Sequence, residues 1–145
     1  METYKKYSIK EVHNLFREWK EQYWDNPEYD TRQLKKIVVT FDDVPVKIYS
    51  QRYELFLSNI TCVNCGLVAS YYKLERQPAS RRYHFNLYGV KDGQEVLFTK
   101  DHIVPKSKGG GNQMHNYQTM CTTCNIEKGS NIIKYSSKGI NNETK

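Results

Sequence analysis

The sequence predicts an α+β fold, in which helices and β-strands occupy separate parts of one small domain. Three observations lead to this prediction. Residues 9–23 carry an apolar stripe at helical spacing, residues 83–101 hold two strand-like runs around an Asp-Gly turn, and two Cys-x2-Cys pairs could share one metal ion. At 145 residues, the chain is long enough for one domain of ordinary size with a small addition.

The N-terminal part of the chain begins with a predicted helix. Ser8 and Glu11 have the spacing of a capping box, in which each side chain bonds the backbone of the other residue. Apolar positions then recur at intervals of 3, 4, 3 and 4 residues, at Ile9, Val12, Phe16, Trp19 and Tyr23. This spacing predicts a helix of about five turns that ends before Asn26-Pro27. The stripe favours packing against a core, and the alternative is a dimer seam or a partner-binding face.

Two short strands follow in the prediction, over residues 36–41 and 44–49, joined by a turn at Asp42-Asp43. Pro45 favours an edge strand, because proline cannot donate a backbone hydrogen bond. A short helix over residues 51–57 is expected next. We interpret residues 1–57 as a helix-and-hairpin extension whose role the sequence does not indicate.

The second half of the chain carries most of the remaining strand signal. Residues 67–74, 83–90 and 95–101 are predicted strands, and the turn at 91–94 pairs the last two as a hairpin. Arg81 and Arg82 lie in the polar loop before this hairpin and are candidates for phosphate contact, or simply exposed arginines. A short strand over residues 116–120 and a helix from Thr122 or Thr123 complete the prediction, and residues 136–145 are expected to be a disordered tail.

The four cysteines predict a structural metal site. Cys62, Cys65, Cys121 and Cys124 form two Cys-x2-Cys pairs, with 55 residues between the pairs. Four thiolates suit a closed, tetrahedral zinc site, and disulfides are the alternative. Only 51 of the 145 residues are apolar or glycine, about 35% against roughly 45–50% in typical domains. A chain with so few apolar residues is a candidate for a metal in place of part of its core.

The net charge of +6 is unevenly distributed. Residues 1–57 hold 10 basic and 10 acidic side chains, whereas residues 58–145 hold 12 and 6. A basic half suits a polyanion such as DNA, since each neutralised phosphate releases counterions. The sequence has neither a long apolar run nor a signal-peptide layout, so we expect no membrane association and a cytoplasmic location in a bacterial or phage-infected cell.

One stretch resembles a known family. Its features, in order, are Asp101-His102-Ile103-Val104-Pro105, Gly109-Gly110, Asn116, Cys121-Thr122-Thr123-Cys124-Asn125 and Lys128. Together they resemble an HNH endonuclease, a member of the ββα-metal (His-Me finger) nucleases. The resemblance runs from near Cys62 to about Ser130. Many members carry histidine where this chain has Asn125, and asparagine is an accepted alternative there.

The resemblance implies a fold and a set of roles. It implies a zinc-stapled ββα-metal (HNH) core over residues 58–135 that cuts DNA phosphodiester bonds and leaves 5′-phosphate and 3′-hydroxyl ends. His102 would be the general base, and Asp101 and Asn125 would hold one Mg²⁺ or another divalent ion at the scissile phosphate. Asn116 would brace the catalytic loop. Lys128 is a candidate phosphate contact, with Lys106 and Lys108 as weaker candidates.

One geometric condition and two alternatives accompany this interpretation. Neighbouring residues of a regular strand point to opposite faces, so Asp101 and His102 can address one phosphate only where the strand bends or ends. One alternative is a non-catalytic, zinc-stabilised module that binds nucleic acid. The other is an HNH subunit of a larger phage or restriction complex, which would use the N-terminal region to bind a protein partner or a second copy of the chain.

Overall fold

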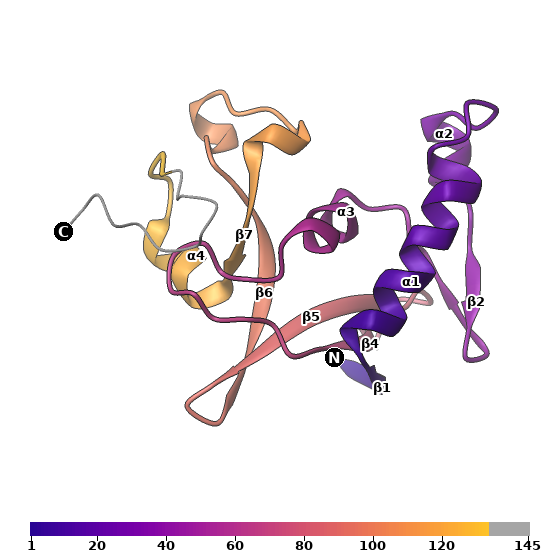
Figure 1. Cartoon of the computed structure of the whole chain (residues 1–145), viewed down its shortest axis with the longest axis horizontal. Helices are drawn as coiled ribbons and strands as arrows, with labels where there is room; N and C mark the ends of the chain where they lie inside the picture. Colours follow the sequence, from indigo (N-terminus) through magenta and orange to yellow (C-terminus); the bar gives the residue numbers. More distant parts are fainter. Residues whose placement is uncertain (134–145) are drawn as a thin grey trace. The chain divides into compact units, whose positions relative to one another are not determined.

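The computed structural model of this chain describes residues 1–133, and the predicted tail 136–145 lies outside them. Helices and strands both occur, as an α+β fold requires. Their order is β1 (Glu2–Tyr7), α1 (Ile9–Trp19), η1 (Lys20–Trp24), α2 (Thr31–Leu34), β2 (Val39–Phe41), β3 (Val44–Val46), α3 (Gln51–Ser58), β4 (Tyr71–Arg76), β5 (His84–Lys91), β6 (Gln94–His102), η2 (Lys106–Lys108), η3 (Met114–Asn116), β7 (Tyr117–Cys121) and α4 (Thr122–Lys128) (Figure 1). No helix within 1–133 is long and apolar enough to cross a membrane.

The chain divides into two units. Unit 1 comprises residues 1–53 and 71–86, and unit 2 comprises residues 54–70 and those from 87 onward. Strand β5 therefore begins in unit 1 and continues into unit 2. The sequence predicted a boundary at residue 57, between an extension and a nuclease core. The two units describe only how the backbone packs, so this boundary stays a prediction.

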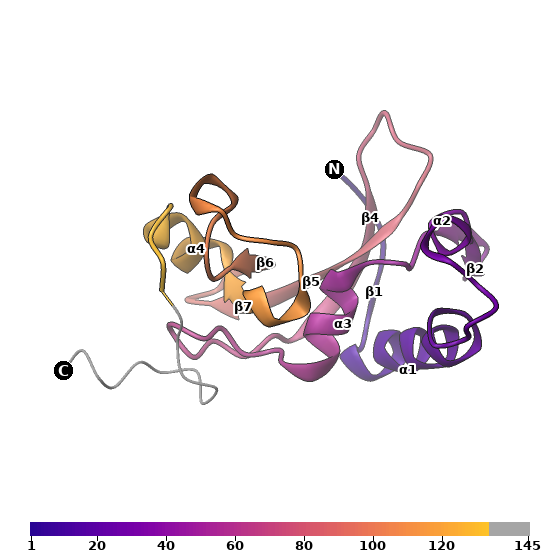
Figure 2. The same ribbon diagram turned by 90° about the horizontal axis from the view of Figure 1, so that it is seen from above.

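Unit 1 contains the capped helix and its strands. Strand β1 pairs antiparallel with β4, from Glu2 opposite Arg76 to Tyr7 opposite Tyr72; both views show the two strands side by side (Figures 1 and 2). Ser8 and Glu11 form the predicted capping box at the start of α1. The apolar stripe of α1 packs into the core of this unit, where Val12 and Phe16 are each only 1% exposed.

The hairpin of unit 1 has the predicted turn, but its strands are shorter than the predicted 36–41 and 44–49. Strands β2 and β3 pair through the turn at Asp42 and Asp43, and both turn residues have positive φ angles, 49° and 66°. Strand β1 and helix α2 were missed by the sequence analysis. The β1 segment is almost entirely exposed and polar, so only its pairing with β4 makes it a strand.

Unit 2 contains two antiparallel pairings that share β6. Tyr88–Lys91 of β5 pairs with β6 through the predicted Asp-Gly turn, and Phe98–His102 of β6 pairs with β7. Helix α4 follows β7 directly and packs against both β6 and β7 (Figure 1). The side chains of Phe98 on β6 and Met120 on β7 are both buried. The strand–strand–helix arrangement of β6, β7 and α4 is the one that the sequence predicts for this region.

A segment without regular structure is joined to this arrangement. The backbone N–H of Val63 donates to the carbonyl of Thr119, at 3.0 Å, and the Thr119 hydroxyl donates to the carbonyl of Asn59, at 2.8 Å. Thr119 is fully buried. Residues 59–63 are thereby held beside β7, which brings the first cysteine pair to the second.

Candidate functional site

The four cysteines form one cluster in unit 2. Cys62 and Cys65 come from the segment before β4, whereas Cys121 ends β7 and Cys124 lies in α4. Their sulfur atoms all lie within 4.8 Å of one another, and no disulfide joins them. The sulfurs of Cys65 and Cys121 are 3.9 Å apart, close to the roughly 3.8 Å edge of a tetrahedron with zinc–sulfur bonds of about 2.3 Å. The cluster can therefore hold one metal ion.

The surroundings raise the pKa of two of the thiols and lower the pKa of a third. Burial raises the pKa of the Cys121 and Cys124 thiols above the ordinary value. At Cys62 burial acts in the same direction, but hydrogen bonds from the backbone of Cys65, Cys121 and Asn64 outweigh it, so the pKa is lowered. Buried thiolates cost free energy unless a cation lies beside them, which is what a bound metal provides.

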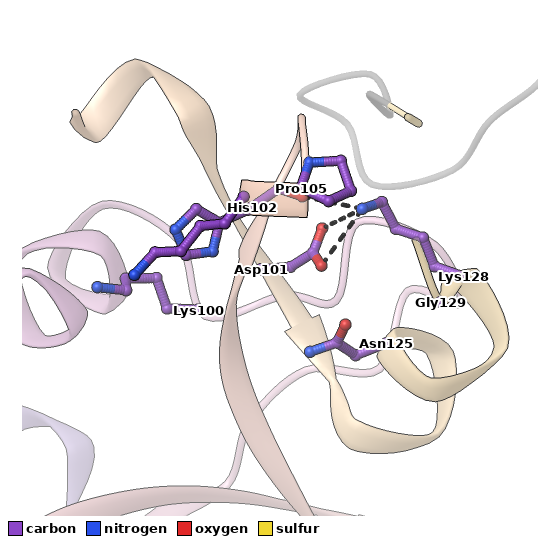
Figure 3. Close-up of a pocket in the computed structure, with 8 residues that line it drawn as sticks. Lys100, Asp101, His102, Pro105, Asn125, Lys128 and Gly129 are labelled. Carbon is purple, nitrogen blue, oxygen red and sulfur yellow. Dashed lines mark hydrogen bonds and ion pairs between the residues drawn. The ribbon is translucent and has the colours of Figure 1, made fainter. Parts of the chain in front are cut away.

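A separate pocket of about 290 Å³ lies at the end of β6. It is lined by Lys100, Asp101, His102, Pro105, Lys106, Asn125, Lys128 and Gly129 (Figure 3). These residues come from β6, the loop after it and α4. Five of them are predicted site residues: Asp101, His102, Lys106, Asn125 and Lys128. The fold therefore gathers side chains that are up to 28 positions apart in the sequence.

Asp101 is buried in this pocket and pairs with Lys128. The two carboxylate oxygens lie 3.4 and 3.2 Å from the Lys128 ammonium nitrogen, and both side chains are almost fully buried. Lys128 also donates to the backbone carbonyl of His102, at 2.9 Å. Gln118 of β7 donates to the same carboxylate, at 3.0 Å. Because removing one member would leave the other charged and buried, this ion pair is a fixed part of the pocket wall.

Asn125 presents its side-chain oxygen to the pocket. Its amide nitrogen donates to the hydroxyl of Thr99, at 3.0 Å, and that hydroxyl in turn donates to the carbonyl of Met120, at 2.8 Å. With the nitrogen held by Thr99, the oxygen lies on the side of Asp101 (Figure 3). A carboxylate and a carboxamide oxygen, both hard ligands, thus face one space.

His102 leaves β6 in the direction opposite to Asp101 (Figure 3). The strand remains regular through His102, which pairs with Tyr117, and ends there. The imidazole Nε2 lies 3.0 Å from the side-chain oxygen of Asn112. The ring also meets the Tyr117 ring edge-on, with 5.0 Å between centroids. The strand therefore ends at the predicted point, and the two side chains approach the pocket from different faces of β6.

Asn116 does not line the pocket but closes the loop 103–116. Its side-chain oxygen accepts from the backbone N–H of Val104, at 2.9 Å, and its nitrogen donates to the carbonyls of Val104 and Gly111, at 3.1 and 2.9 Å. Its backbone carbonyl accepts from the N–H of Ile103, at 2.8 Å. These bonds join both ends of the loop to one buried side chain. These hydrogen bonds help to hold the loop that follows His102.

The loop needs a glycine at position 110, because there is no room there for a side chain. A Cβ atom at Gly110 would lie 1.7 Å from the carbonyl oxygen of Val104 and 3.0 Å from the side-chain nitrogen of Asn116. The Val104 oxygen belongs to the backbone, and the Asn116 side chain is held by its own hydrogen bonds, so neither atom can easily move away. The loop can pass this close to Val104 only because position 110 has no side chain.

The remaining predicted residues lie elsewhere. Lys108 is exposed in η2 and does not line the pocket, and Arg81 and Arg82 are exposed in the loop between β4 and β5 of unit 1. Lys100 and Asn112 were not predicted as site residues from the sequence. Lys100 could have been found, because residues two apart on a strand share a face and His102 was already a candidate. Asn112 could not, since its contact with His102 depends on the path of the loop.

One comparison with known proteins found a match for this part of the chain. Residues 88–141 match the family model described as HNH endonuclease. No curated protein and no solved structure matched the chain. The matched stretch contains the pocket, the loop held by Asn116 and the second cysteine pair. This part of the chain, residues 88–141, is therefore similar to the HNH endonuclease family.

Proposed function

We propose that this protein is a metal-dependent endonuclease that hydrolyses DNA phosphodiester bonds at the pocket of β6 and α4. One observation supports this most strongly. Within a domain of a nuclease family, an imidazole, a carboxylate and a carboxamide from two separate elements line one pocket. A non-catalytic module that merely binds nucleic acid would not need these three groups together.

The opposite directions of Asp101 and His102 suit the geometry of the reaction. In phosphoryl chemistry the attacking and leaving oxygens lie roughly in line, on opposite sides of phosphorus. A phosphodiester placed across the end of β6 would have the imidazole on one side and the oxygens of Asp101 and Asn125 on the other. His102 then takes a proton from the attacking water, a role for which imidazole suits neutral pH.

The donor set fits a hard divalent cation. Mg²⁺ is typically bound in proteins through one or two carboxylate-type oxygens, with water and phosphate oxygens filling the other positions. Asp101 and Asn125 would supply two such oxygens, and the bound ion would stabilise the charge on the leaving oxygen. Lys128 holds the Asp101 carboxylate from another side (Figure 3) and adds positive charge that a phosphate would meet.

The cysteine cluster would have a structural role. We assign zinc to it, because four thiolates form the closed tetrahedral site that zinc prefers. It would join the segment with Cys62 and Cys65 to the start of α4, which carries Asn125. Zinc would thereby help to hold the carboxamide in place without taking part in the reaction.

Cleavage of supercoiled plasmid with Mg²⁺ tests the proposal. The wild type should convert the plasmid to nicked or linear DNA, and a chelator should stop the reaction. His102→Ala should reduce the rate by about 10²–10⁴-fold, the usual contribution of a general base. A DNA ligase should reseal the nicks directly if the products carry 5′-phosphate and 3′-hydroxyl ends.

The matched control is His115→Ala. His115 is exposed in the same loop and does not line the pocket, so its loss should leave the rate unchanged. Wild-type rates in folded His102→Ala would contradict the proposed mechanism. DNA binding without cleavage by the wild type would favour the non-catalytic alternative, and an RNA transcript run in parallel shows which nucleic acid is cut.

A further inference from the structure

The contact between His102 and Asn112 assigns the two ring nitrogens of the imidazole. Nε2 lies 3.0 Å from the side-chain oxygen of Asn112. A carboxamide oxygen only accepts hydrogen bonds, so Nε2 must carry the proton in the neutral ring. The lone pair of that ring is then on Nδ1. Within residues 1–133, no other group hydrogen-bonds the imidazole of His102.

We propose that Asn112 is a positioning residue for His102, which holds the Nε2 proton and so presents Nδ1 as the nitrogen that accepts a proton from water. The inference rests on the proposed function, which makes His102 the general base. It goes further by naming the residue and the atom that set the tautomer. In a histidine, the hydrogen bond made by one ring nitrogen decides which form the other takes.

Two features of the surroundings support this role. The Tyr117 ring and the imidazole form a T-shaped pair with an interplanar angle of 79°, which restricts the tilt of His102 but not which nitrogen is protonated. The loop that carries Asn112 is fixed by the bonds from Asn116 to Val104 and Gly111. The backbone near Asn112 is therefore held in place, although the Asn112 side chain is exposed.

The first test reads the imidazole directly and needs no activity. The ring nitrogens of His102 are observed by NMR in protein labelled with nitrogen-15 at histidine, at a pH where the ring is neutral. The His102→Ala spectrum identifies their signals. The wild type should show a proton on Nε2 and none on Nδ1, whereas Asn112→Leu should show values averaged between the two tautomers. Protonated Nδ1 in the wild type, or unchanged signals in Asn112→Leu, would overturn the proposal.

The second test separates positioning from binding. Asn112→Leu should lower kcat for plasmid cleavage about tenfold with KM little changed, as expected for one lost hydrogen bond that acts in the reaction. Asn112→Asp keeps an oxygen acceptor and should restore most of the rate. Gln113→Leu is the matched control, because it removes a neighbouring exposed amide that does not contact His102.

The outcomes distinguish the two proposals. If the wild type cleaves no nucleic acid, the proposed function fails, and the NMR measurement still decides the role of Asn112. If the wild type cleaves plasmid and Asn112→Leu keeps its full kcat, the positioning role is refuted while the nuclease assignment stands. A raised KM with unchanged kcat would also refute it, because that result indicates substrate contact.

Discussion

The side chains of the pocket are held by neighbours that no local pattern reveals. Lys128 forms a buried ion pair with Asp101. The side-chain amide of Asn125 donates a hydrogen bond to Thr99. The imidazole of His102 is hydrogen-bonded to Asn112. Each of these second residues contacts the side chain of one pocket residue. Lys128 had been predicted as a phosphate contact; its ammonium group lies against Asp101, and a direct contact with phosphate stays a prediction.

A prediction at the residue scale concerns Gly110. Gly110→Ala should destabilise the protein by about 1–3 kcal/mol, the usual range for overpacking, because the new methyl group collides with the Val104 carbonyl. Plasmid cleavage should fall as well, since the bonds between Asn116 and Val104 must lengthen. Denaturant unfolding and the cleavage rate measure the two effects.

Gly111→Ala is the matched control for this substitution. A Cβ there would meet only the end of the Gln113 side chain, which can rotate away. Both measurements should therefore stay near wild type. Equal effects of the two substitutions would show that general loop flexibility, and not the close approach at Gly110, governs the loop.

At the scale of elements, the cysteine cluster joins β7 and α4 to the segment with Cys62 and Cys65. Cys121→Ser should abolish metal binding and unfold the part of the chain around the cluster, because a structural zinc ion contributes folding free energy directly. Metal analysis by mass spectrometry should find one zinc ion per wild-type chain and none in the variant. Circular dichroism should show the loss of structure.

Thr123→Ser is the matched control, because it tests whether a substitution beside the cysteines is enough to cause loss of metal and of structure. Thr123 is exposed on the helix between Cys121 and Cys124, so its loss of a methyl group should affect neither metal content nor folding. A Cys121→Ser protein that is folded and free of zinc would contradict the structural role of the metal.

A second prediction at this scale concerns the packing of α1 on β4. His13 is buried, and its Nε2 lies 2.9 Å from the Tyr72 hydroxyl. Burial, with a smaller effect of Arg17, lowers the pKa of His13 from 6.5 to about 4. The folded state therefore holds His13 neutral, and its unfolded state binds more protons between these values. Stability should be full above pH 6.5 and fall as pH drops towards 4, by an amount on the order of 3 kcal/mol.

His13→Gln isolates this contribution. Glutamine can still hydrogen-bond Tyr72 but does not titrate, so the variant should lose less stability between pH 6.5 and 4 than the wild type. Tryptophan fluorescence during denaturant unfolding is a suitable measurement, because both tryptophans, Trp19 and Trp24, lie in unit 1. Identical pH dependence in the two proteins would refute the contribution of His13.

At the scale of the whole molecule, the uneven charge bears on the binding of DNA. The excess of basic residues lies in residues 58–145, which include the stretch that matches the HNH endonuclease family model. We predict that affinity for DNA falls steeply with salt, and that Lys106→Ala reduces the slope of log K against log salt by about 1 if Lys106 contacts one phosphate. Fluorescence anisotropy with labelled duplex DNA measures both.

Glu127→Gln controls for the change in net charge. It removes one exposed acidic side chain on α4 outside the pocket lining, so it should alter affinity slightly and leave the salt slope near that of the wild type. An unchanged slope in Lys106→Ala would mean that this pocket residue does not meet the phosphate backbone.

Most of the elements could be predicted from local signals. The capping box at Ser8, the turn at Asp42 and Asp43, and the Asp-Gly turn between β5 and β6 each depend on residues close together in the sequence. Strand β1 could not be predicted, because its polar segment becomes a strand only through hydrogen bonds to β4, some 70 positions away. The sequence predicted five of the residues that line the pocket, and it failed where a contact depended on the path of the loop.

The sequence by itself determined the set of chemical groups, namely four thiols, an Asp-His pair, two asparagines and a basic second half, because residue types and their spacing are properties of the chain alone. The tertiary structure decided how these groups are arranged and which of them are in contact. It buried Lys128 against Asp101, directed Asp101 and His102 to opposite faces of β6, and placed Asn112 against Nε2. The physical reason is that side-chain direction, burial and hydrogen bonding depend on groups that meet only when distant segments pack together.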